Sequence, residues 1–155
     1  MLKIEKFLPK HLEEVIEISR AQFGVHGWQA DLFKEEFGKE NHFAFVALCG
    51  DEVVSFVFVM KTYGERGEDY NILNIATKKS YENKGIATKL LTFLEEYAQN
   101  EEVFQLWLEV RQHNENAITF YKNMGFKLDY VRKNYYANGD NALVMSKSLD
   151  YGKPL

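Results

Sequence analysis

The sequence has few of the features that mark secreted, membrane-bound or nucleic-acid-binding proteins. Its 155 residues include one cysteine, Cys49, which excludes an internal disulfide framework and a thiolate metal site and fits a reducing compartment. No apolar run approaches the roughly 18 residues that a membrane helix needs, and the N-terminus lacks a signal-peptide pattern. The formal net charge of -4 provides no basic field for a phosphate backbone. We therefore expect a soluble, cytoplasmic protein without DNA or membrane partners.

Internal repeats, low-complexity stretches and linkers rich in proline, glycine or serine are also missing, so nothing indicates a boundary between domains. What the sequence has instead is apolar surface, because 46% of its residues are hydrophobic and 15% are aromatic. A chain of this length and composition can bury a core. We predict one domain that spans residues 1–155.

The spacing of apolar residues predicts helices and strands in the order βααβββαβαββ. We expect strands at residues 2–6, 43–49, 53–62, 71–77, 103–110, 126–132 and 142–147. We expect helices to begin at Pro9, at Gln29, after Gly85 and at Asn114, the last of them ending at Gly125, and a polar loop at residues 63–68. This order predicts an α/β or α+β fold in which helices pack on a mixed sheet.

The turn at residues 82–87, with the sequence ENKGIA, lies where a strand ends and a helix begins. The first backbone N–H groups of a helix lack helical partners, so such an end attracts phosphate, and the helix dipole adds positive potential. Gly85 allows close approach of the backbone, and Ala87 leaves the groove open. A single glycine at a helix start is, however, more often only a turn residue. The turn matches neither the dinucleotide nor the P-loop pattern, which argues against nicotinamide and ATP sites.

Stretches in the second half of the chain resemble the GNAT acetyltransferase superfamily. They are NIAT at residues 74–77, YENKGIA at 81–87, LWLEVR at 106–111, Asn114, Ala117-Ile118, Tyr121, Gly125-Phe126, RKNYY at 132–136 and DNALVM at 140–145. Within the superfamily, their order and spacing are similar to those of the RimI-type N-alpha-acetyltransferases of ribosomal proteins. The resemblance implies a mixed, mainly antiparallel sheet flanked by helices, and an N-acetyltransferase that uses acetyl-CoA as co-substrate.

The resemblance also implies which residues bind acetyl-CoA. The pantetheine arm would be lined by backbone groups of Ile75, Ala76 and Thr77. The pyrophosphate would be held by Asn83, Lys84, Gly85, Ile86, Ala87 and Thr88, and the cofactor would be contacted again by Asn114. The family usually has Gln or Arg at the position of Glu82 and a second glycine at the position of Ala87. Because an acidic side chain beside a pyrophosphate is unfavourable, we expect Glu82 to point away from it.

Acetyl transfer from a thioester to an amine needs a neutral amine, stabilisation of the oxyanion and a proton for the departing thiolate. Glu109, at a strand end and partly shielded by Trp107, is suited to take the amine proton, although a carboxylate there is more often simply solvated. Tyr121 lies in a helical stripe where an aromatic ring usually packs in a core, yet its hydroxyl can also face a cleft. In RimI-type enzymes these positions are the general base and the proton donor. The resemblance therefore implies catalytic roles for Glu109 and Tyr121, with a backbone N–H near residues 75–77 at the oxyanion.

Other kinds of chemistry have less support in the sequence. The four histidines show no metal-like spacing with one another or with Cys49, so we predict no metal site. The serines do not lie in the nucleophile-elbow context of a hydrolase. Plain aromatic packing is sufficient to explain Tyr135 and Tyr136, although in the resembling family aromatic residues near here flank the acceptor groove.

Three hypotheses about the acceptor stay open. A free α-amine has a pKa of about 7.7 to 8.0 and a lysine about 10.4, so a single modest base suits an α-amine at neutral pH. The first hypothesis is therefore acetylation of a protein or peptide N-terminus. The second is acetylation of a small-molecule amine, and the third is a CoA-binding module without catalysis. Residues 23–29 resemble the family's acceptor loop only loosely, and we expect a monomer or a homodimer.

Overall fold

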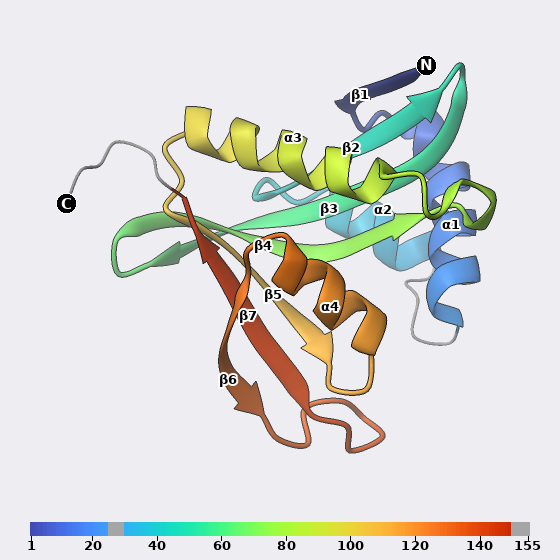
Figure 1. Cartoon of the computed structure of the whole chain (residues 1–155). Coiled ribbons are helices and arrows are strands. Elements are labelled where there is room, and N and C mark those ends of the chain that lie inside the picture. The colour runs from blue at the N-terminus through green and yellow to red at the C-terminus, as the bar shows by residue number, and fades with distance from the viewer. Residues whose placement is uncertain (25–29, 150–155) are drawn as a thin grey trace. The chain divides into compact units, whose positions relative to one another are not determined.

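The chain folds into the predicted series of helices and strands. A computed structural model describes residues 1–24 and 30–149, and Figure 1 shows its elements in chain order. The elements are β1 (Leu2–Lys6), η1 (Pro9–His11), α1 (Leu12–Phe23), α2 (Ala30–Phe37), β2 (His42–Cys49), β3 (Glu52–Gly64), β4 (Gly67–Thr77), η3 (Lys79–Tyr81), α3 (Ile86–Asn100), β5 (Gln105–Arg111), α4 (Glu115–Asn123), β6 (Lys127–Arg132) and β7 (Ala142–Ser148). The order βααβββαβαββ is confirmed. No helix in the described ranges is long and apolar enough to cross a membrane.

The strands form a 7-stranded mixed sheet in the order β1-β2-β3-β4-β5-β7-β6. β2 pairs antiparallel with both β1 and β3, and β7 pairs antiparallel with both β5 and β6. β4 pairs parallel with β5, for example at Tyr70 and Leu106. The prediction of a mixed, mainly antiparallel sheet with helices packed on it is confirmed.

The polar loop predicted at residues 63–68 is wrong. β3 continues to Gly64 and β4 begins at Gly67, which leaves only a tight turn between the two strands. Polar groups hold these strand ends, since Thr62 Oγ1 donates a hydrogen bond to the backbone carbonyl of Asp69 at 3.3 Å. Apolar alternation marks only strands that have a buried face, so the exposed and polar end of this hairpin has the sequence pattern of a loop.

The described residues fall into two compact units. The first unit contains Met1–Lys61 and Leu73–Glu96, and the second contains Thr62–Ile72 and the described residues from Tyr97 on. β3, β4 and α3 contribute residues to both units. That the whole chain is one domain stays a prediction.

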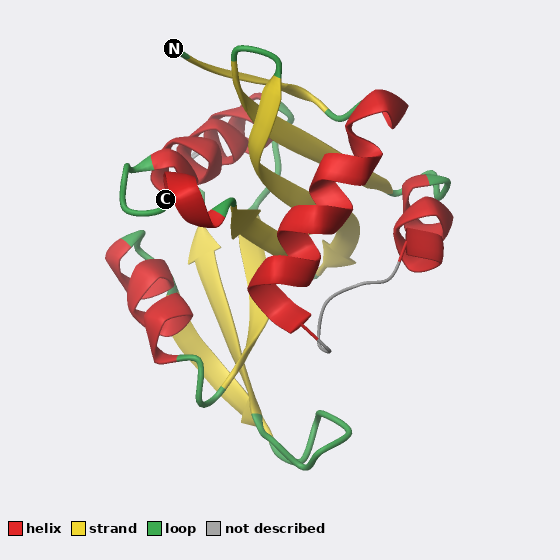
Figure 2. Cartoon of the chain, turned by 90° about the vertical axis from the view of Figure 1, so that its right-hand side faces the viewer, coloured by secondary structure: helices red, strands yellow, loops and turns green. Residues whose placement is uncertain are grey.

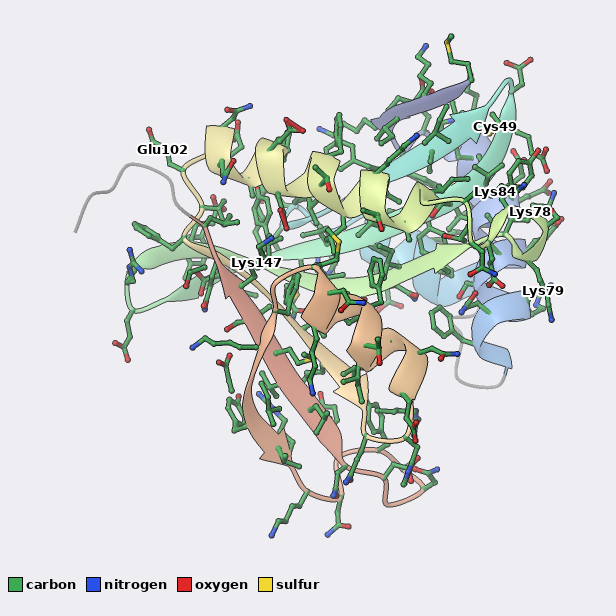
Figure 3. The ribbon with its side chains drawn as sticks, viewed as in Figure 1. Cys49, Lys78, Lys79, Lys84, Glu102 and Lys147 are labelled. Atoms are coloured by element: carbon green, nitrogen blue, oxygen red, sulfur yellow. The ribbon has the colours of Figure 1, made fainter. Side chains whose placement is uncertain are left out.

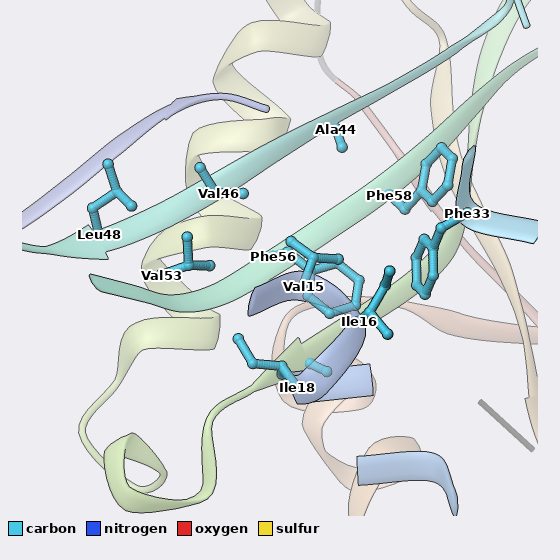
Figure 4. Packing of buried hydrophobic residues seen from close by; sticks show 11 residues of the cluster. Val15, Ile16, Ile18, Phe33, Ala44, Val46, Leu48, Val53, Phe56 and Phe58 are labelled. Atoms are coloured by element: carbon cyan, nitrogen blue, oxygen red, sulfur yellow. The ribbon is translucent and has the colours of Figure 1, made fainter. Parts of the chain in front are cut away.

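The first unit has its main apolar cluster where α1 and α2 pack on β2 and β3. Figure 4 shows Val15 of α1 and Phe33 of α2 close to Phe56 and Phe58 of β3, and all four side chains are at most 1% exposed. Full burial of one such side chain stabilises the fold by about 1.5–3 kcal/mol. Ala76, near the end of β4, belongs to the same cluster. The packing of the cluster therefore also fixes the end of β4.

A smaller cluster lies on the other face of the same strands. Ala47 of β2 and Val54 of β3 pack there with Ile86, the first residue of α3. Phe45 meets Phe93 of α3 edge to face, with 5.0 Å between ring centroids. Figure 2, which is coloured by type of element, shows helices on both faces of these strands. The start of α3 is thus anchored by an apolar residue directly after the glycine turn.

The second unit is built on β5, β6 and β7 with α4. Along β5 the residues Leu106, Leu108 and Val110 are buried, while those between them are half-buried, as expected for a strand with one face in a core. Helix α4 ends before Gly125, whose φ of +96° confirms the predicted helix stop. The end of α4 is bonded to β7, because Lys147 Nζ donates to the Met124 carbonyl at 2.7 Å.

Candidate active site

Helix α3 begins without a side-chain cap. The carbonyl of Gly85 accepts the first helical hydrogen bond, from Lys89 N at 3.1 Å, but glycine has no side chain to bond the free N–H groups that follow. Within the part of the chain that the structure describes, the backbone N–H groups of residues 83–88 have no hydrogen-bond acceptor. A run of free donors at the positive end of a 15-residue helix fits an anionic group such as a pyrophosphate.

The backbone of this turn has a conformation that most residues avoid. Asn83 has a φ of 62° and Gly85 a φ of 78°, both in the left-handed region. Asparagine tolerates that region better than other residues with a side chain, and glycine adopts it freely. A Cβ atom on Gly85 would meet nothing within 4 Å. Glycine is therefore required here for its φ, and the space beside it is open to a ligand.

Lysines surround the turn. Figure 3 shows Lys78 and Lys79, which follow β4, and Lys84 of the turn itself around the start of α3. Lys78 is ion-paired with Glu52, whose carboxylate raises the pKa of Lys78 through their hydrogen bond. Lys84 is exposed. The charges of Lys79 and Lys84 add to the helix dipole at the turn. That Glu82, also exposed, points away from a bound pyrophosphate stays a prediction.

The segment predicted to line pantetheine, residues 75–77, is fixed by a serine of β3. Ser55 Oγ donates to the Ala76 carbonyl at 2.8 Å and lies 3.0 Å from Thr77 Oγ1. Ser55 and Ala76 are buried, while Ile75 and Thr77 are half-buried. These bonds hold the end of β4 in place, and the contacts of this segment with pantetheine and with the oxyanion stay predictions.

Glu109 lies on β5 in the second unit, where two residues of the β6–β7 region hold its carboxylate. Arg132 Nε, at the end of β6, is 3.1 Å from Glu109 Oε2. The hydroxyl of Tyr135 donates to Glu109 Oε1 at 3.2 Å. The Glu109 side chain retains 20% of its accessible surface. Trp107, two residues earlier and on the same face of the strand, is half-buried and donates from Nε1 to Thr62 Oγ1 at 3.0 Å.

The groups around Glu109 keep their protons at neutral pH. Burial raises the pKa of Tyr135 and of Tyr136, and the negative charge of Glu109 raises both further. The Tyr135 hydroxyl therefore stays a donor to the carboxylate. A hydrogen bond to the Tyr130 hydroxyl raises the pKa of Arg132, and the charge of Glu109 adds to this effect. Arg132 is a permanent cation beside the carboxylate.

Tyr121 of α4 is 6% exposed, and its ring packs as a core aromatic does. It meets Phe120 and Phe126 edge to face, with ring centroids 5.3 Å and 5.4 Å away. Burial raises the pKa of Tyr121 far above the ordinary value of 10.0. A phenol that stays neutral keeps its proton and fits a proton donor.

Asn114 caps helix α4, as its position in the sequence predicts. Its Oδ1 accepts a hydrogen bond from Ala117 N at 3.2 Å. Asn114 is exposed, and the cap uses its amide oxygen and not its amide nitrogen. A contact of this nitrogen with the cofactor stays a prediction.

The two units divide the predicted residues between them. The first unit contains Ile75, Ala76, Thr77, Asn83, Lys84, Gly85, Ile86, Ala87 and Thr88, and the second contains Glu109, Asn114 and Tyr121. Most of the predicted acceptor loop, at residues 25–29, lies outside the described residues. Within residues 1–24 and 30–149, no group of three His, Cys, Asp or Glu side chains could hold a metal ion.

Sequence reasoning missed Arg132 as the partner of Glu109. The register of the sheet makes them neighbours: Glu109 pairs with Val144 of β7, and Val144 pairs with Tyr130 of β6, two residues before Arg132. β7, the last strand in the sequence, lies between β5 and β6. Glu109 and Arg132 therefore meet across β7. Alternation along β5 and β6 shows which face each residue occupies but not which strand lies beside it.

Comparisons with known proteins show a family that this chain resembles over most of its length. A model of the "Acetyltransferase (GNAT) family" matches residues 12–126. The [Ribosomal protein bS18]-alanine N-acetyltransferase of Haemophilus ducreyi is 29% identical over 150 residues, which cover 94% of this chain and 99% of that protein. An N-alpha-acetyltransferase of Saccharolobus solfataricus is 28% identical over 147 residues, 89% of this chain and 87% of that protein.

Among solved structures, the ribosomal-protein-S18-alanine N-acetyltransferase from Escherichia coli superposes with a TM-score of 0.81 and 25% sequence identity, over 96% of this chain and 94% of that chain. The fold and the free N–H groups at the start of α3 fit an enzyme that binds a phosphate-bearing co-substrate. The family match covers most of the sequence, and the chain belongs to the acetyltransferase (GNAT) family. It is an N-acetyltransferase that uses acetyl-CoA as co-substrate.

Proposed function

We propose that the protein acetylates the α-amine of a protein or peptide N-terminus. The observation that carries this proposal is the state of Glu109. Its Oε1 is bonded to Tyr135, while its Oε2 is buried without a hydrogen bond. An ionised carboxylate has about four acceptor positions, so the Glu109 carboxylate, whose side chain keeps 20% of its surface exposed, can still accept an N–H from an amine. Relatives that carry the names of N-terminal acetyltransferases support the same class of acceptor.

In this proposal Glu109 is the general base and Tyr121 the general acid. The Glu109 carboxylate accepts a proton from the amine while the amine nitrogen bonds to the acetyl carbon. As the C–S bond of the thioester breaks, the Tyr121 hydroxyl protonates the departing sulfur. The products are the acetylated amine and free CoA. Transfer of one proton from Glu109 to the Tyr121 oxygen through water then restores both groups.

The residues of the first unit would bind the co-substrate. Free N–H groups of residues 83–88 would hold the pyrophosphate, with Gly85 supplying the left-handed φ. Backbone groups of Ile75, Ala76 and Thr77 would bind the pantetheine arm, and the amide nitrogen of Asn114 would make a further contact. We expect this reaction in the cytoplasm; a monomeric or homodimeric state stays a prediction.

The acceptor class is tested by steady-state acetylation of a panel of amines. The panel contains peptides with a free N-terminus, the same peptides with a blocked N-terminus and one internal lysine, polyamines, amino sugars and free amino acids. We expect the highest kcat/KM for free N-termini. Turnover only on the small amines would show that the protein is an acetyltransferase of small molecules, and this proposal would then be wrong.

A further inference from the structure

Residues 133–141 connect β6 to β7 by turns and bends, and they carry Tyr135, whose hydroxyl bonds to Glu109. The backbone of this segment, the β6–β7 loop, has two left-handed positions, Asn134 with a φ of 53° and Gly139 with a φ of 89°. A loop of this kind has no strand ladder to hold it, so its conformation depends on the side chains that bond to it. That conformation decides whether the Tyr135 hydroxyl reaches the carboxylate.

Arg111, the last residue of β5, contacts the β6–β7 loop at three side chains. Its Nη1 donates to Asp140 Oδ2 at 3.1 Å and to Asn138 Oδ1 at 3.2 Å. Its guanidinium lies over the ring of Tyr136, 3.8 Å from the ring centroid. A planar guanidinium can donate in its own plane and stack on a ring with its face, which the compact ammonium group of a lysine cannot. Arg111 therefore binds the loop from both sides of its turn.

The contacts of Arg111 are charged and partly shielded from water. The side chains of Arg111 and Asp140 keep 24% and 26% of their accessible surface. Hydrogen bonds from Asn138 and from Arg111 lower the pKa of Asp140, so its carboxylate is ionised at neutral pH. Charge-assisted hydrogen bonds are roughly twice as strong as those between neutral groups. The pair therefore favours one conformation of the loop.

A second set of bonds joins the loop to the residue that follows Arg111. Gln112 N donates to the Asn141 carbonyl at 3.0 Å, and Asn141 Nδ2 donates to Gln112 Oε1 at 2.7 Å. The Oδ1 of the same asparagine accepts from Asn134 N at 2.9 Å. Tyr135 thus lies between a residue that is tied to β5 through Asn141 and a residue whose ring is covered by Arg111.

We propose that Arg111 is a positioning residue for acetyl transfer, which acts through the β6–β7 loop to keep the Tyr135 hydroxyl on Glu109 and the carboxylate in place for the acceptor amine. This inference rests on the proposed function, in which Glu109 is the general base. A general base has to lie within hydrogen-bond reach of the proton that it takes, and a misplacement of about 1 Å can cost about 100-fold in rate. Arg111 is always protonated, so it exchanges no proton in this role.

The test is a double-mutant cycle on kcat, measured with the amine that the wild-type protein acetylates fastest. Arg111→Gln should lower kcat about tenfold, a part of the loss that a misplacement of about 1 Å can cause, and leave the KM for acetyl-CoA unchanged. Tyr135→Phe removes only the hydroxyl and should lower kcat by a similar factor. In a Tyr135→Phe protein, Arg111→Gln should lower kcat by less than about twofold, because the bond through which Arg111 acts is already missing.

Two further variants make the cycle specific. Arg66→Gln is the matched control, since Arg66 also lies over an aromatic ring, that of Phe104 at 4.8 Å, but in the turn between β3 and β4. It should leave kcat unchanged. Asp140→Ala removes the anionic partner of Arg111 and keeps the arginine over its ring. It should lower kcat in the same direction, and it takes the place of Arg111→Gln in the cycle if that protein does not fold.

The outcomes separate this inference from the proposed function. If Glu109→Gln keeps the wild-type kcat, Glu109 is not the base, and the role of Arg111 falls with the proposed mechanism. If Glu109→Gln is slow, but Arg111→Gln keeps the wild-type kcat, the role of Arg111 alone is wrong. It is also wrong if Arg111→Gln lowers kcat by the same factor with and without the Tyr135 hydroxyl, which is the result that a merely structural role would give.

Discussion

The turn before α3 and the carboxylate on β5 differ in the groups that form them: backbone groups form the first and side chains the second. The turn uses backbone N–H groups of consecutive residues, and it requires a left-handed φ at Asn83 and at Gly85. The carboxylate of Glu109 depends on side chains from β6 and the segment that follows it, Arg132 and Tyr135. We therefore expect the first site to tolerate changes of side chain better than the second.

This difference separates the binding of the co-substrate from the chemistry. Substitutions at Glu109 or Tyr121 should change kcat with little effect on the affinity for acetyl-CoA. Substitutions that alter the backbone at the turn should change the affinity and leave the chemical step intact. Three substitutions test this division, and a fourth tests the stability of a buried acid; they follow from the largest expected effect to the smallest.

Glu109→Gln should have the largest effect. Removal of a general base lowers the rate by about 10²–10⁴-fold, because the amine then has to lose its proton to water. The glutamine can still accept from Tyr135, so the fold and the dissociation constant for acetyl-CoA should be unchanged. Steady-state kinetics and calorimetric titration measure the two quantities. Glu96→Gln, at an exposed position of α3, is the matched control. A Glu109→Gln enzyme as fast as wild type would remove the residue from the mechanism.

Tyr121→Phe should lower kcat by about 100-fold, at the lower end of the range for general acid–base catalysis. The phenyl ring preserves the packing on Phe120 and Phe126, so acetyl-CoA binding should be retained. Tyr63→Phe, at a position that is 79% exposed, controls for loss of a tyrosine hydroxyl. Equal rates for Tyr121→Phe and wild type would leave the ring as a core residue only.

Gly85→Ala should raise the KM for acetyl-CoA about tenfold with a smaller change in kcat. A left-handed φ costs an alanine roughly 1–2 kcal/mol, and relief of this strain turns the N–H groups away from the ligand. Gly50→Ala is the control, because Gly50 also has a positive φ, of 62°, and its Cβ would also meet nothing within 4 Å. A KM effect common to both variants would mean that general strain, and not the turn, is responsible.

Asp69→Asn should have the smallest effect. It should change the free energy of unfolding and leave the activity unchanged. Asp69 is 7% exposed, and burial raises its pKa, although a hydrogen bond from Gln105 opposes the shift. An acid with a raised folded-state pKa costs stability as pH rises through the interval between its ordinary and raised values, and the cost is constant above that interval. The asparagine should therefore add about 1.4 kcal/mol per unit of pKa difference at pH 7.

Urea unfolding at pH 7 and at pH 4 measures the effect of Asp69→Asn. The gain in the free energy of unfolding should shrink at the lower pH, where the native carboxyl takes up its proton. Asp69 and Glu109 differ in the charge of their partners. Asp69 accepts from the neutral amide of Gln105, whereas Glu109 lies beside the permanent cation Arg132. A variant that is less stable than wild type at pH 7 would show that the hydrogen bond outweighs burial.

Features that depend on residues close in sequence could be predicted from the sequence, while contacts between distant residues could not. Local features were predictable: the cap at Asn114, the stop at Gly125 and the turn around Gly85 each depend on residues close in sequence. The order of elements was predictable because apolar residues repeat with the period of each element. The hairpin end near Thr62 was not, since polar cross-strand bonds leave no apolar alternation.

The pairing of Glu109 with Arg132 could not be predicted from local pattern either. It depends on the insertion of β7 between β5 and β6 and on a register that brings Tyr130 opposite Val144. The roles assigned to Glu109 and Tyr121 came from resemblance to a family and not from spacing. The structure adds the burial, the packing and the partners of these two residues. Their catalytic roles stay predictions.

The missing cap at Gly85 has a consequence for the protein without its co-substrate. Amide hydrogens that have no acceptor exchange with solvent water without any prior opening of the helix, so residues 83–88 should exchange deuterium within seconds. A bound pyrophosphate would supply the missing acceptors and slow that exchange, and it would raise the thermal stability in proportion to the logarithm of its concentration. The ligand would thus complete the first turn of α3 as a capping side chain completes an ordinary helix.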